Sequence, residues 1–413
     1  MAASKSSEFD AIIVGAGPGG ASMAMYLQKQ GQNVLLLEKS EFPRDKICGD
    51  AIGVRAMVVL RELGIADQME AQKHEKTYGV IFSSPKGQTV QIQFPNTDPS
   101  TGKGGYVCRR MVFDNFLFQN AKKRVLNVRE NIQVTDLIWE NDFVVGVKAI
   151  DLKTKQHLEF KSKIVIGADG ASGIVAAKLG LNASLPEHEC IALRQYYENI
   201  GGCTNNIEIH FVDSLLPGYF WIFPLENNTA NVGVGMLASD IKKKKVKLQE
   251  SMDAVIKNDP LFKERFAKAK AISDIKGWRL PLGSFHRKCH GNGWILLGDA
   301  ASLIDPFSGE GIGNSMTSSR IADKILAKAF EKNDFSENFL RQYDTELWKE
   351  LGPELKTSSY LQKLGKIKPL LNFVINKASK NKRVQKEISG MLANENAKKE
   401  MANPLFYLKL LFA

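Results

Sequence analysis

Mainly apolar runs of strand length lie at residues 9–14, 33–37 and 294–297, and such runs are typical of strands buried on both faces of a parallel sheet. Residues 21–30 are an uninterrupted stretch of helix formers between the first two runs, and Gly31 follows as a left-handed cap. The order of strand, helix and strand predicts a βαβ unit near the start of the chain.

Strand-forming residues also gather in two segments that interrupt this pattern, at 78–94 and 185–236. These segments predict a second domain made from insertions into the first. After residue 331 the pattern is that of helices. The expected boundaries are 1–77, 105–180 and 279–330 for the first domain, 78–104 and 181–278 for the inserted domain, and 331–413 for a helical C-terminal region.

The length of 413 residues exceeds what one hydrophobic core usually serves, in agreement with two or more packed units. With 44% hydrophobic and 24% charged residues, the composition is that of a globular protein and argues against disorder or a fibrous repeat. No apolar run approaches the roughly 18 residues of a membrane-spanning helix, and no secretory signal is recognisable. The five cysteines form no CxxC pair, so we expect reduced thiols and a cytoplasmic protein.

The formal charge of +11 is unevenly distributed, because the last 53 residues carry a net +8. Nucleic acid is not an expected partner, since this basic stretch has neither interleaved aromatics nor a reading helix. Residues 361–384 mix Leu, Ile, Phe and Val with Lys and Arg, and seven of the last eight residues are apolar. This region either contacts the inner face of a membrane peripherally or packs on the inserted domain and buries Phe406 and Leu410, and the sequence slightly favours packing.

A glycine-rich motif directly follows the first predicted strand. Gly15, Gly17 and Gly20 have the spacing G-x-G-x-x-G, and Glu38 ends the second strand 18 residues after Gly20. The first glycine allows a tight turn, the second lets the backbone approach a pyrophosphate, and the third lets the helix pack on the strand. The acid accepts the ribose hydroxyls of adenosine. The unit predicts dinucleotide binding rather than a merely tight turn, but it does not separate FAD from NAD(P).

A second glycine-rich stretch, at residues 298–316, follows the strand predicted at 294–297. Asp299 stands at the strand end, and Gly309, Gly311 and Gly313 precede a helix that opens near residue 314. A carboxylate in such a place accepts ribose or ribityl hydroxyls, and glycines at a helix start offer bare amides to an anion or an electron-rich ring edge. A glycine-rich loop without a ligand is the less favoured interpretation, because the chain already carries a nucleotide motif.

This pair of motifs resembles the flavoprotein superfamily of the aromatic hydroxylases, the flavin-dependent halogenases and the geranylgeranyl reductases. Residues 164–170, IVIGADG, are similar to its third signature, with Asp169 at the strand end. The resemblance implies an α/β fold: a Rossmann-like FAD-binding domain of the glutathione-reductase type, an inserted antiparallel sheet that binds substrate, and a helical C-terminal region. The arginine that hydroxylases carry after the DG pair is replaced by Ala176 and Ala177, so the electron donor, NAD(P)H or another reductant, stays open.

Residues 42–53, FPRDKICGDAIG, look like the R/K-x-C-G segment of the geranylgeranyl reductases. That match implies that Cys48 lies near the reacting face of the flavin, where it is a candidate catalytic residue. The neighbouring cations Arg44 and Lys46 would favour its thiolate. The competing interpretation is a small, buried cysteine without chemistry.

Residues 216–236 look like the Y-x-W-x-F-P segment of the same branch, whereas a halogenase would show W-x-W-x-I-P. Alternation along the strand places its three aromatic side chains on one face. If the turn is a three-residue loop, Leu225 pairs with Thr229 and glycines lie opposite the aromatics, which leaves a groove for a long apolar ligand; a two-residue loop puts valines there instead. Ordinary core packing is the competing interpretation. The expected substrate-binding residues are Tyr219, Trp221, Phe223, Gly233 and Gly235.

Further matches to the superfamily are less specific. Residues 106–118 are similar to an R-x-x-F-D-x-x-L segment at a helix start beneath the cofactor, and no histidine or cysteine spacing suits a metal. The residues that the resemblance assigns to FAD are Gly15, Gly17, Gly20, Glu38, Lys39, Cys48, Gly49, Ala51, Arg110, Val134, Asp169, Asp299, Pro306, Gly311 and Ile312.

The sequence therefore predicts an FAD-dependent oxidoreductase that saturates carbon–carbon double bonds of a polyprenyl, geranylgeranyl-type lipid. Hydride would come from the reduced flavin, and a proton from Cys48, a tyrosine or water. Two alternatives stay open: a monooxygenase that hydroxylates an aromatic or lipid substrate, and a flavin- or lipid-binding protein without turnover.

Overall fold

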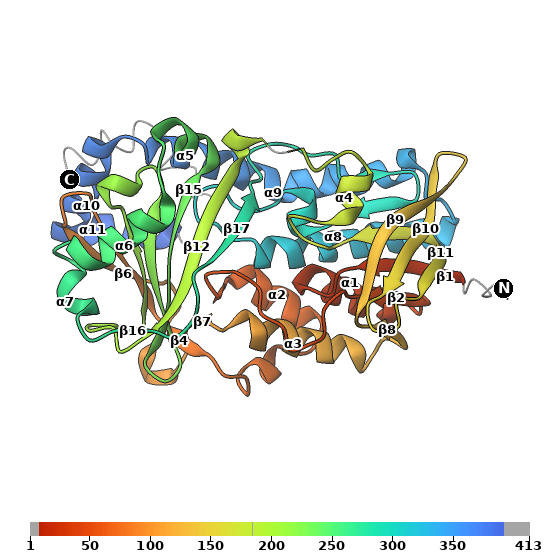
Figure 1. Cartoon of the computed structure of the whole chain (residues 1–413), viewed down its shortest axis with the longest axis horizontal. Coiled ribbons are helices and arrows are strands. Elements are labelled where there is room, and N and C mark those ends of the chain that lie inside the picture. Colours follow the sequence, from red (N-terminus) through yellow and green to blue (C-terminus); the bar gives the residue numbers. More distant parts are fainter. Residues whose placement is uncertain (1–7, 184, 392–413) are drawn as a thin grey trace.

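Two large sheets lie side by side along the longest axis of the molecule, and the long helix α9 runs past both (Figure 1). The structure is a computed structural model that describes residues 8–183 and 185–391. One sheet lies at the end that carries the N-terminus, and the other lies beside the C-terminal helices (Figure 1).

The first sheet has the order β18-β19-β11-β1-β2-β8, and all neighbours on this path except β18 and β19 are parallel. An antiparallel ribbon of β9 and β10 extends from β11. The strands predicted at 9–14, 33–37 and 294–297 are confirmed. Its strands are β1 (Glu8–Val14), β2 (Val34–Leu37), β8 (Asn127–Arg129), β9 (Ile132–Glu140), β10 (Phe143–Asp151), β11 (His157–Gly167), β18 (His290–Gly291) and β19 (Trp294–Leu296).

Helices cover this sheet because both of its faces are apolar. Ile12, Ile13, Leu35 and Leu36 are fully buried. The first crossover helix, α1 (Pro18–Lys29), packs against α3 and α8, and Gly31 follows it with a φ of 80°, as predicted for the cap. The other helices of this half are α2 (Val54–Glu62), α3 (Arg110–Lys122), α4 (Ile174–Lys178) and α8 (Ile312–Lys332).

The second sheet has the order β16-β12-β15-β14-β13-β5-β6, with β17 also paired to β12. Every pair is antiparallel except β13 with β5. Helices α5 (Ala238–Lys244), α6 (Leu248–Asn258) and α7 (Lys263–Phe266) belong to this half. Its strands are β5 (Gly79–Ser83), β6 (Thr89–Gln93), β12 (Glu189–Glu198), β13 (Asn206–His210), β14 (Tyr219–Leu225), β15 (Thr229–Leu237), β16 (Lys270–Ala271) and β17 (Lys276–Pro281).

The hairpin of β14 and β15 has the register expected for a three-residue loop. Leu225 pairs with Thr229, which sets Trp221 opposite Gly233 and Tyr219 opposite Gly235. A small third sheet, with the order β3-β7-β4, lies between the two large sheets. Its strands are β3 (Ala51–Ile52), β4 (Glu75–Thr77) and β7 (Gly105–Val107).

The C-terminal region is helical, as predicted: α9 (Glu337–Leu364), α10 (Lys368–Lys380) and α11 (Lys382–Met391). The apolar sides of α10 and α11 pack on β6, where Ile375 and Val384 are buried with Val90 and Ile92. Over the described part of this region, packing on the second sheet is therefore confirmed. Phe406 and Leu410 lie outside the described residues. Within residues 8–183 and 185–391, none of the helices combines the length and apolar character needed to span a bilayer.

Replacing Phe220 by Ala tests the core of the second sheet. Phe220 is fully buried against Phe262 and Phe266. We expect the free energy of unfolding to fall by about 3–5 kcal/mol, because a large apolar side chain is lost and a cavity remains. Urea denaturation followed by tryptophan fluorescence measures this change. The control Leu126→Ala, at a side chain 92% exposed, should stay within about 0.5 kcal/mol of the wild type; equal losses in both variants would contradict the packing described.

Candidate functional site

The first glycine motif is built so tightly that larger residues do not fit. Gly15 has a φ of 97°, and a Cβ there would lie 2.6 Å from the carbonyl oxygen of Ala168. A Cβ on Gly20 would lie 1.8 Å from the carbonyl oxygen of Gly15. These contacts fold the β1–α1 turn against the segment that follows β11, so the first and third motifs of the sequence are adjacent.

Two helices begin at glycines with no side chain to cap them. Gly17 precedes α1 and Gly311 precedes α8, and neither helix has a side-chain cap or an acidic residue in its first turn. A Cβ on Gly17 would meet only the tip of Arg44, at 3.7 Å. Uncapped amides at a helix start favour an anion. The residues present therefore fit a dinucleotide with its phosphates at these helix starts.

Glu38 holds the backbone around this turn. Its carboxylate accepts hydrogen bonds from the Ala16 N–H at 2.9 Å and the Ser40 N–H at 3.0 Å, and the side chain is buried. Its carbonyl oxygen accepts from the N–H of Ile132, at the start of the strand that carries Val134. Glu38 and Val134 thus lie near each other beside the β1–α1 turn.

The third motif also serves a structural purpose. Asp169 accepts a hydrogen bond from the Val175 N–H at 3.0 Å, at the start of α4. Burial raises the pKa of the Asp169 carboxyl to about 6, and the exposed Lys39 acts against that rise. Ala176, one of the two residues in place of the hydroxylase arginine, is buried.

The second glycine-rich stretch, at residues 298–316, forms the other side of the candidate site. A Cβ on Gly311 would lie 3.3 Å from Asp299 Oδ1, so Asp299 stands beside the start of α8. Ile312 is buried at that start, and the carbonyl oxygen of Pro306 accepts from Gln362 at 2.7 Å. Asp305, which the sequence did not single out, shapes this loop: it accepts from the N–H groups of Phe307 and Ser308 and from the Ser358 hydroxyl.

The structure adds Arg110 to the cations expected around Cys48. Arg44 pairs with Asp114 at 2.9 Å. Arg110 forms two hydrogen bonds to the same carboxylate, at 2.6 and 2.8 Å. Burial opposes the charge of Arg110, but Asp114 and then Cys48 raise its pKa above the usual value, so Arg110 lies beside Cys48. The sequence did not name Arg110 for this place, and Arg44 bonds the same Asp114 carboxylate.

Lys46 is the second cation near Cys48, as predicted. Its Nζ lies 3.5 Å above the ring of Trp278. Burial lowers the pKa of Lys46 to about 8, and Asp299 and Cys48 act in the opposite direction. Lys46 therefore stands between the Cys48 loop and the Asp299 loop.

A buried polar network ties the Cys48 loop to the second sheet. Asn231, on β15, donates to the carbonyl oxygen of Cys48 and to Asp50 Oδ2, both at 2.7 Å, and its Oδ1 accepts from Trp221 Nε1 at 2.9 Å. Asp50 has a φ of 70° and also accepts from the Tyr196 hydroxyl at 2.8 Å. Burial raises the pKa of the Asp50 carboxyl to about 6. No pattern in the sequence pointed to Asp50, Tyr196 or Asn231.

Two arginines reinforce this junction. The guanidinium carbons of Arg109 and Arg194 lie 4.3 and 4.0 Å from the centre of the Tyr196 ring. Arg194 is buried and pairs with Asp45 at 3.0 Å. Asp45 belongs to the Cys48 segment, so its ion pair with Arg194 fixes that segment to β12. The contacts of the two guanidinium groups with the Tyr196 ring strengthen this attachment.

The aromatic face of β14 contacts both predicted cofactor loops. A Cβ on Gly49 would lie 3.1 Å from the ring of Phe223, and the Tyr219 hydroxyl donates to the Ser308 carbonyl oxygen at 3.1 Å. The expected open space opposite Trp221 is filled, however, because a Cβ on Gly233 would lie 2.2 Å from the indole itself. The glycine lets the indole lie close against β15. Tyr219, Trp221 and Phe223 together form one aromatic surface, which we call the aromatic wall.

Within the part of the chain that the structure describes, no group of three His, Cys, Asp or Glu side chains is arranged to hold a metal ion.

Replacing Asn231 by Asp tests the buried network. The variant loses two donors and places a second carboxylate beside Asp50, whose folded pKa of about 6 already exceeds that of an unfolded aspartate. In this variant, the two carboxyl groups contribute most to the free energy of unfolding at low pH, where they share a proton. That contribution is lost as the pH rises through the folded pKa. We expect a loss of roughly 3 kcal/mol at about pH 8 and much less at about pH 5, measured by urea denaturation.

The control Asn228→Asp adds the same charge at an exposed position of the hairpin. It should show little loss at either pH. A pH-independent loss in Asn231→Asp would show that Asp50 and residue 231 do not share charge.

Comparisons with known proteins agree with this geometry. The FAD binding domain family matches residues 8–348. The chain is 33% identical over 357 residues to digeranylgeranylglycerophospholipid reductase 2 of Methanococcoides burtonii, which covers 85% of this chain and 82% of that protein. A geranylgeranyl bacteriochlorophyll reductase-like structure from Thermoplasma acidophilum has a TM-score of 0.80 at 24% identity, over 91% of this chain and 92% of that one.

A flavin-dependent brominase also shares the fold, with a TM-score of 0.75 at 22% identity over 94% of this chain and 93% of that one. The predicted α/β flavoprotein fold and the predicted family are both confirmed. The chain belongs to the FAD binding domain family and, within it, to the digeranylgeranylglycerophospholipid reductase family of FAD-dependent oxidoreductases.

Proposed function

We propose that this protein reduces carbon–carbon double bonds in the polyprenyl chains of a glycerophospholipid. Relatives of at least 30% identity are named digeranylgeranylglycerophospholipid reductases. The main structural support for the proposal is the hydrogen-bond network of Asn231. This one side chain holds both the Trp221 indole and the Cys48 backbone. An apolar, aromatic wall is thereby held next to the loops that fit the cofactor.

Bound FAD, once reduced, supplies the hydride for such a reaction. The protein residues do the remaining work. Tyr219, Trp221 and Phe223 form a wall for an apolar chain and exclude water, which matters because an isolated alkene has no polar group to activate. Cys48 is the proposed proton donor, and the cationic side chains of Arg110 and Lys46 lie near it.

The cofactor contacts are proposed at the same residues as in the sequence analysis. Gly15, Gly17 and Gly20 would cradle the pyrophosphate with the start of α1, and Glu38 would receive the ribose. Asp299 and the start of α8 would hold the ribityl and ring end. The buried pair of Arg110 with Asp114 lies beside the Cys48 segment, through Arg44 and Asp50.

Anaerobic turnover tests the proposal. Protein reduced with dithionite and mixed with digeranylgeranylglycerophospholipid should yield lipid that gains pairs of hydrogen atoms, detected by mass spectrometry. A parallel aerobic sample with NAD(P)H tests the hydroxylase alternative, since a gain of oxygen there, without hydrogenation in the anaerobic sample, would contradict the proposal. Retained yellow cofactor with no lipid change in either sample would favour binding without turnover.

Cys48→Ala tests the proton donor. We expect turnover to fall by about a hundredfold, the range typical of a lost general acid, while the flavin absorbance spectrum stays unchanged. The matched control Cys203→Ala lies on the opposite side of the second sheet, beside Arg265, and should keep full turnover. If Cys48→Ala lost the cofactor instead, the residue would belong to the binding site and not to the chemistry.

Trp221→Ala tests the aromatic wall. The change removes the indole that lies against Gly233 and a hydrogen bond to Asn231. Turnover should fall by about tenfold or more because the alkene is no longer held in position, with FAD still bound. Steady-state kinetics with retained absorbance would support the wall, and unchanged kinetics would remove Trp221 from the substrate site.

We also propose that the basic C-terminal region makes peripheral contact with a membrane that carries anionic lipid. Its helices turn their apolar sides to the second sheet and leave Lys380, Lys382 and Arg383 exposed. Each such charge contributes about 1 kcal/mol near an anionic surface. The double variant Lys380→Glu/Lys382→Glu should float about tenfold less with phosphatidylglycerol vesicles, whereas Lys122→Glu/Lys123→Glu at the C-terminal end of α3 should match the wild type. Equal flotation of both variants would contradict this contact.

A further inference from the structure

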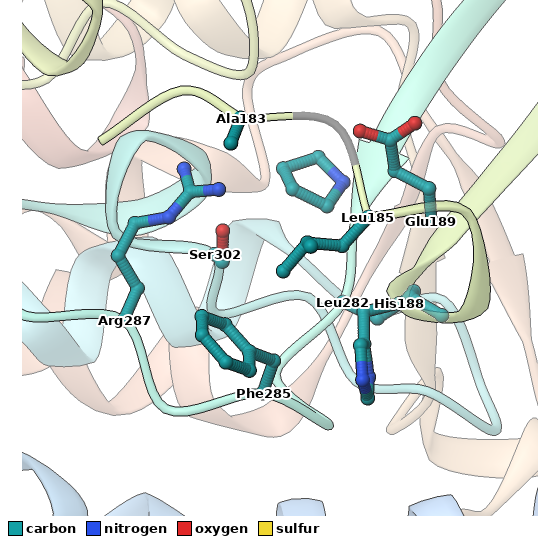
Figure 2. A pocket seen from close by; sticks show the side chains of 9 residues that line it. Ala183, Leu185, His188, Glu189, Leu282, Phe285, Arg287 and Ser302 are labelled. Atoms are coloured by element: carbon teal, nitrogen blue, oxygen red, sulfur yellow. The ribbon is translucent and has the colours of Figure 1, made fainter. Parts of the chain in front are cut away.

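A small hollow lies between the end of β17 and the loop after Asp299, where the two halves of the protein meet. Figure 2 shows its lining, and about 200 Å³ of unfilled space opens from it on one side to solvent. Its enclosed end has room for about one oxygen-sized group. Leu185 and Phe285 form its apolar side, while Arg287 and Ser302 bring polar groups into it.

Ser302 is held rigidly with an unused hydroxyl. The residue is 3% exposed and has a φ of 56°, and its N–H donates to the Asp299 carbonyl oxygen at 3.0 Å. Its buried Oγ has no hydrogen-bond partner among the described residues. A buried hydroxyl without a partner is unfavourable, so a ligand that accepts its hydrogen would be stabilised there.

Arg287 brings a positive charge to the same space. Among residues 8–183 and 185–391 it forms no ion pair, and its one hydrogen bond there, to the Ala300 carbonyl oxygen, is long at 3.5 Å. Burial, and then the neighbouring Arg279, lower the pKa of Arg287, so its charge is poorly compensated. In Figure 2 its guanidinium and the Ser302 hydroxyl point toward one space.

The one carboxylate that lines the hollow offsets this charge only in part. Glu189 lies on the opposite side in Figure 2 and pairs with Arg279 at 3.0 Å. His188 is turned away and shares a hydrogen bond with Ser284. The two arginines and one carboxylate leave a net positive charge beside an unused hydroxyl donor.

We propose that Arg287 and Ser302 form a binding site for a phosphoryl group. One phosphoryl oxygen would enter the enclosed end and accept the Ser302 hydroxyl hydrogen, while the guanidinium of Arg287 donates to the others from the open side. The site is separate from the proposed lipid site and does not depend on it. The phosphoryl group could belong to free phosphate or to a nicotinamide dinucleotide, the class of reductant that carries phosphates.

The test uses the FAD-loaded protein and three probes: inorganic phosphate, NADH and NADPH, each against sodium chloride of equal ionic strength. The rise in the thermal midpoint with probe concentration reports binding. In Arg287→Gln and Ser302→Ala the half-effect concentration should rise by about tenfold or more. Lys288→Gln, which removes the same charge from the neighbouring exposed residue, should behave as the wild type.

Each outcome decides the proposal. Stabilisation by phosphate alone, lost in the two variants, supports a site for free phosphate. Stabilisation by NADH or NADPH, lost in the same variants, supports docking of the dinucleotide, and a preference for NADPH assigns its additional phosphate to Arg287. No stabilisation by any probe, or equal stabilisation in all variants, would overturn the proposal. Because no lipid is present, this result is independent of the reductase proposal.

Discussion

The side chain of Asn231 connects the two sheets of this protein at the place where chemistry is proposed. It donates to the backbone of Cys48 and to the buried Asp50, and it accepts from the Trp221 indole. The Cys48 loop, which follows the first βαβ unit, is thereby fixed to a strand of the inserted sheet. Without this connection the aromatic face and the glycine loops would be two unrelated surfaces.

The connection is made of polar groups in a buried place, and this explains its specificity. A buried carboxylate such as Asp50 is tolerated only when its oxygens are satisfied, and here a tyrosine hydroxyl, an amide and the Arg110 N–H supply the donors. Loss of one donor would leave a buried charge uncompensated. The network therefore permits one arrangement of the Cys48 loop against β14 and β15 and disfavours others.

Local patterns in the sequence sufficed for much of the fold. The apolar runs and the Gly15–Gly20 motif predicted the βαβ unit, because strand burial and a tight turn are properties of adjacent residues. The hairpin register depends on loop length, which the sequence left open between two and three residues, and the structure has the three-residue register with Tyr219 opposite Gly235. Family resemblance then supplied the cofactor, which the first motif alone did not identify.

Long-range partners were out of reach of the same reasoning. Asn231 and Asp50 are 181 positions apart, and although each lies in a segment that resembles the family, neither segment shows that the two side chains meet. The space above Gly233 was expected to be open, because the sequence does not show that the Trp221 indole itself fills it. Likewise, the sequence did not show that Arg110, on a helix distant in the chain, lies beside Cys48 and shares Asp114 with Arg44. In each case the deciding interaction depends on tertiary placement.

The most direct measurement is the reoxidation of the reduced protein by lipid in the absence of oxygen. Protein bleached with dithionite is freed of excess reductant and mixed rapidly with digeranylgeranylglycerophospholipid, and the absorbance of oxidised flavin is followed. The account predicts that the yellow colour returns with wild-type protein and returns much more slowly with Cys48→Ala. A protein that stays bleached with this lipid, yet recovers its colour on exposure to air, would contradict it.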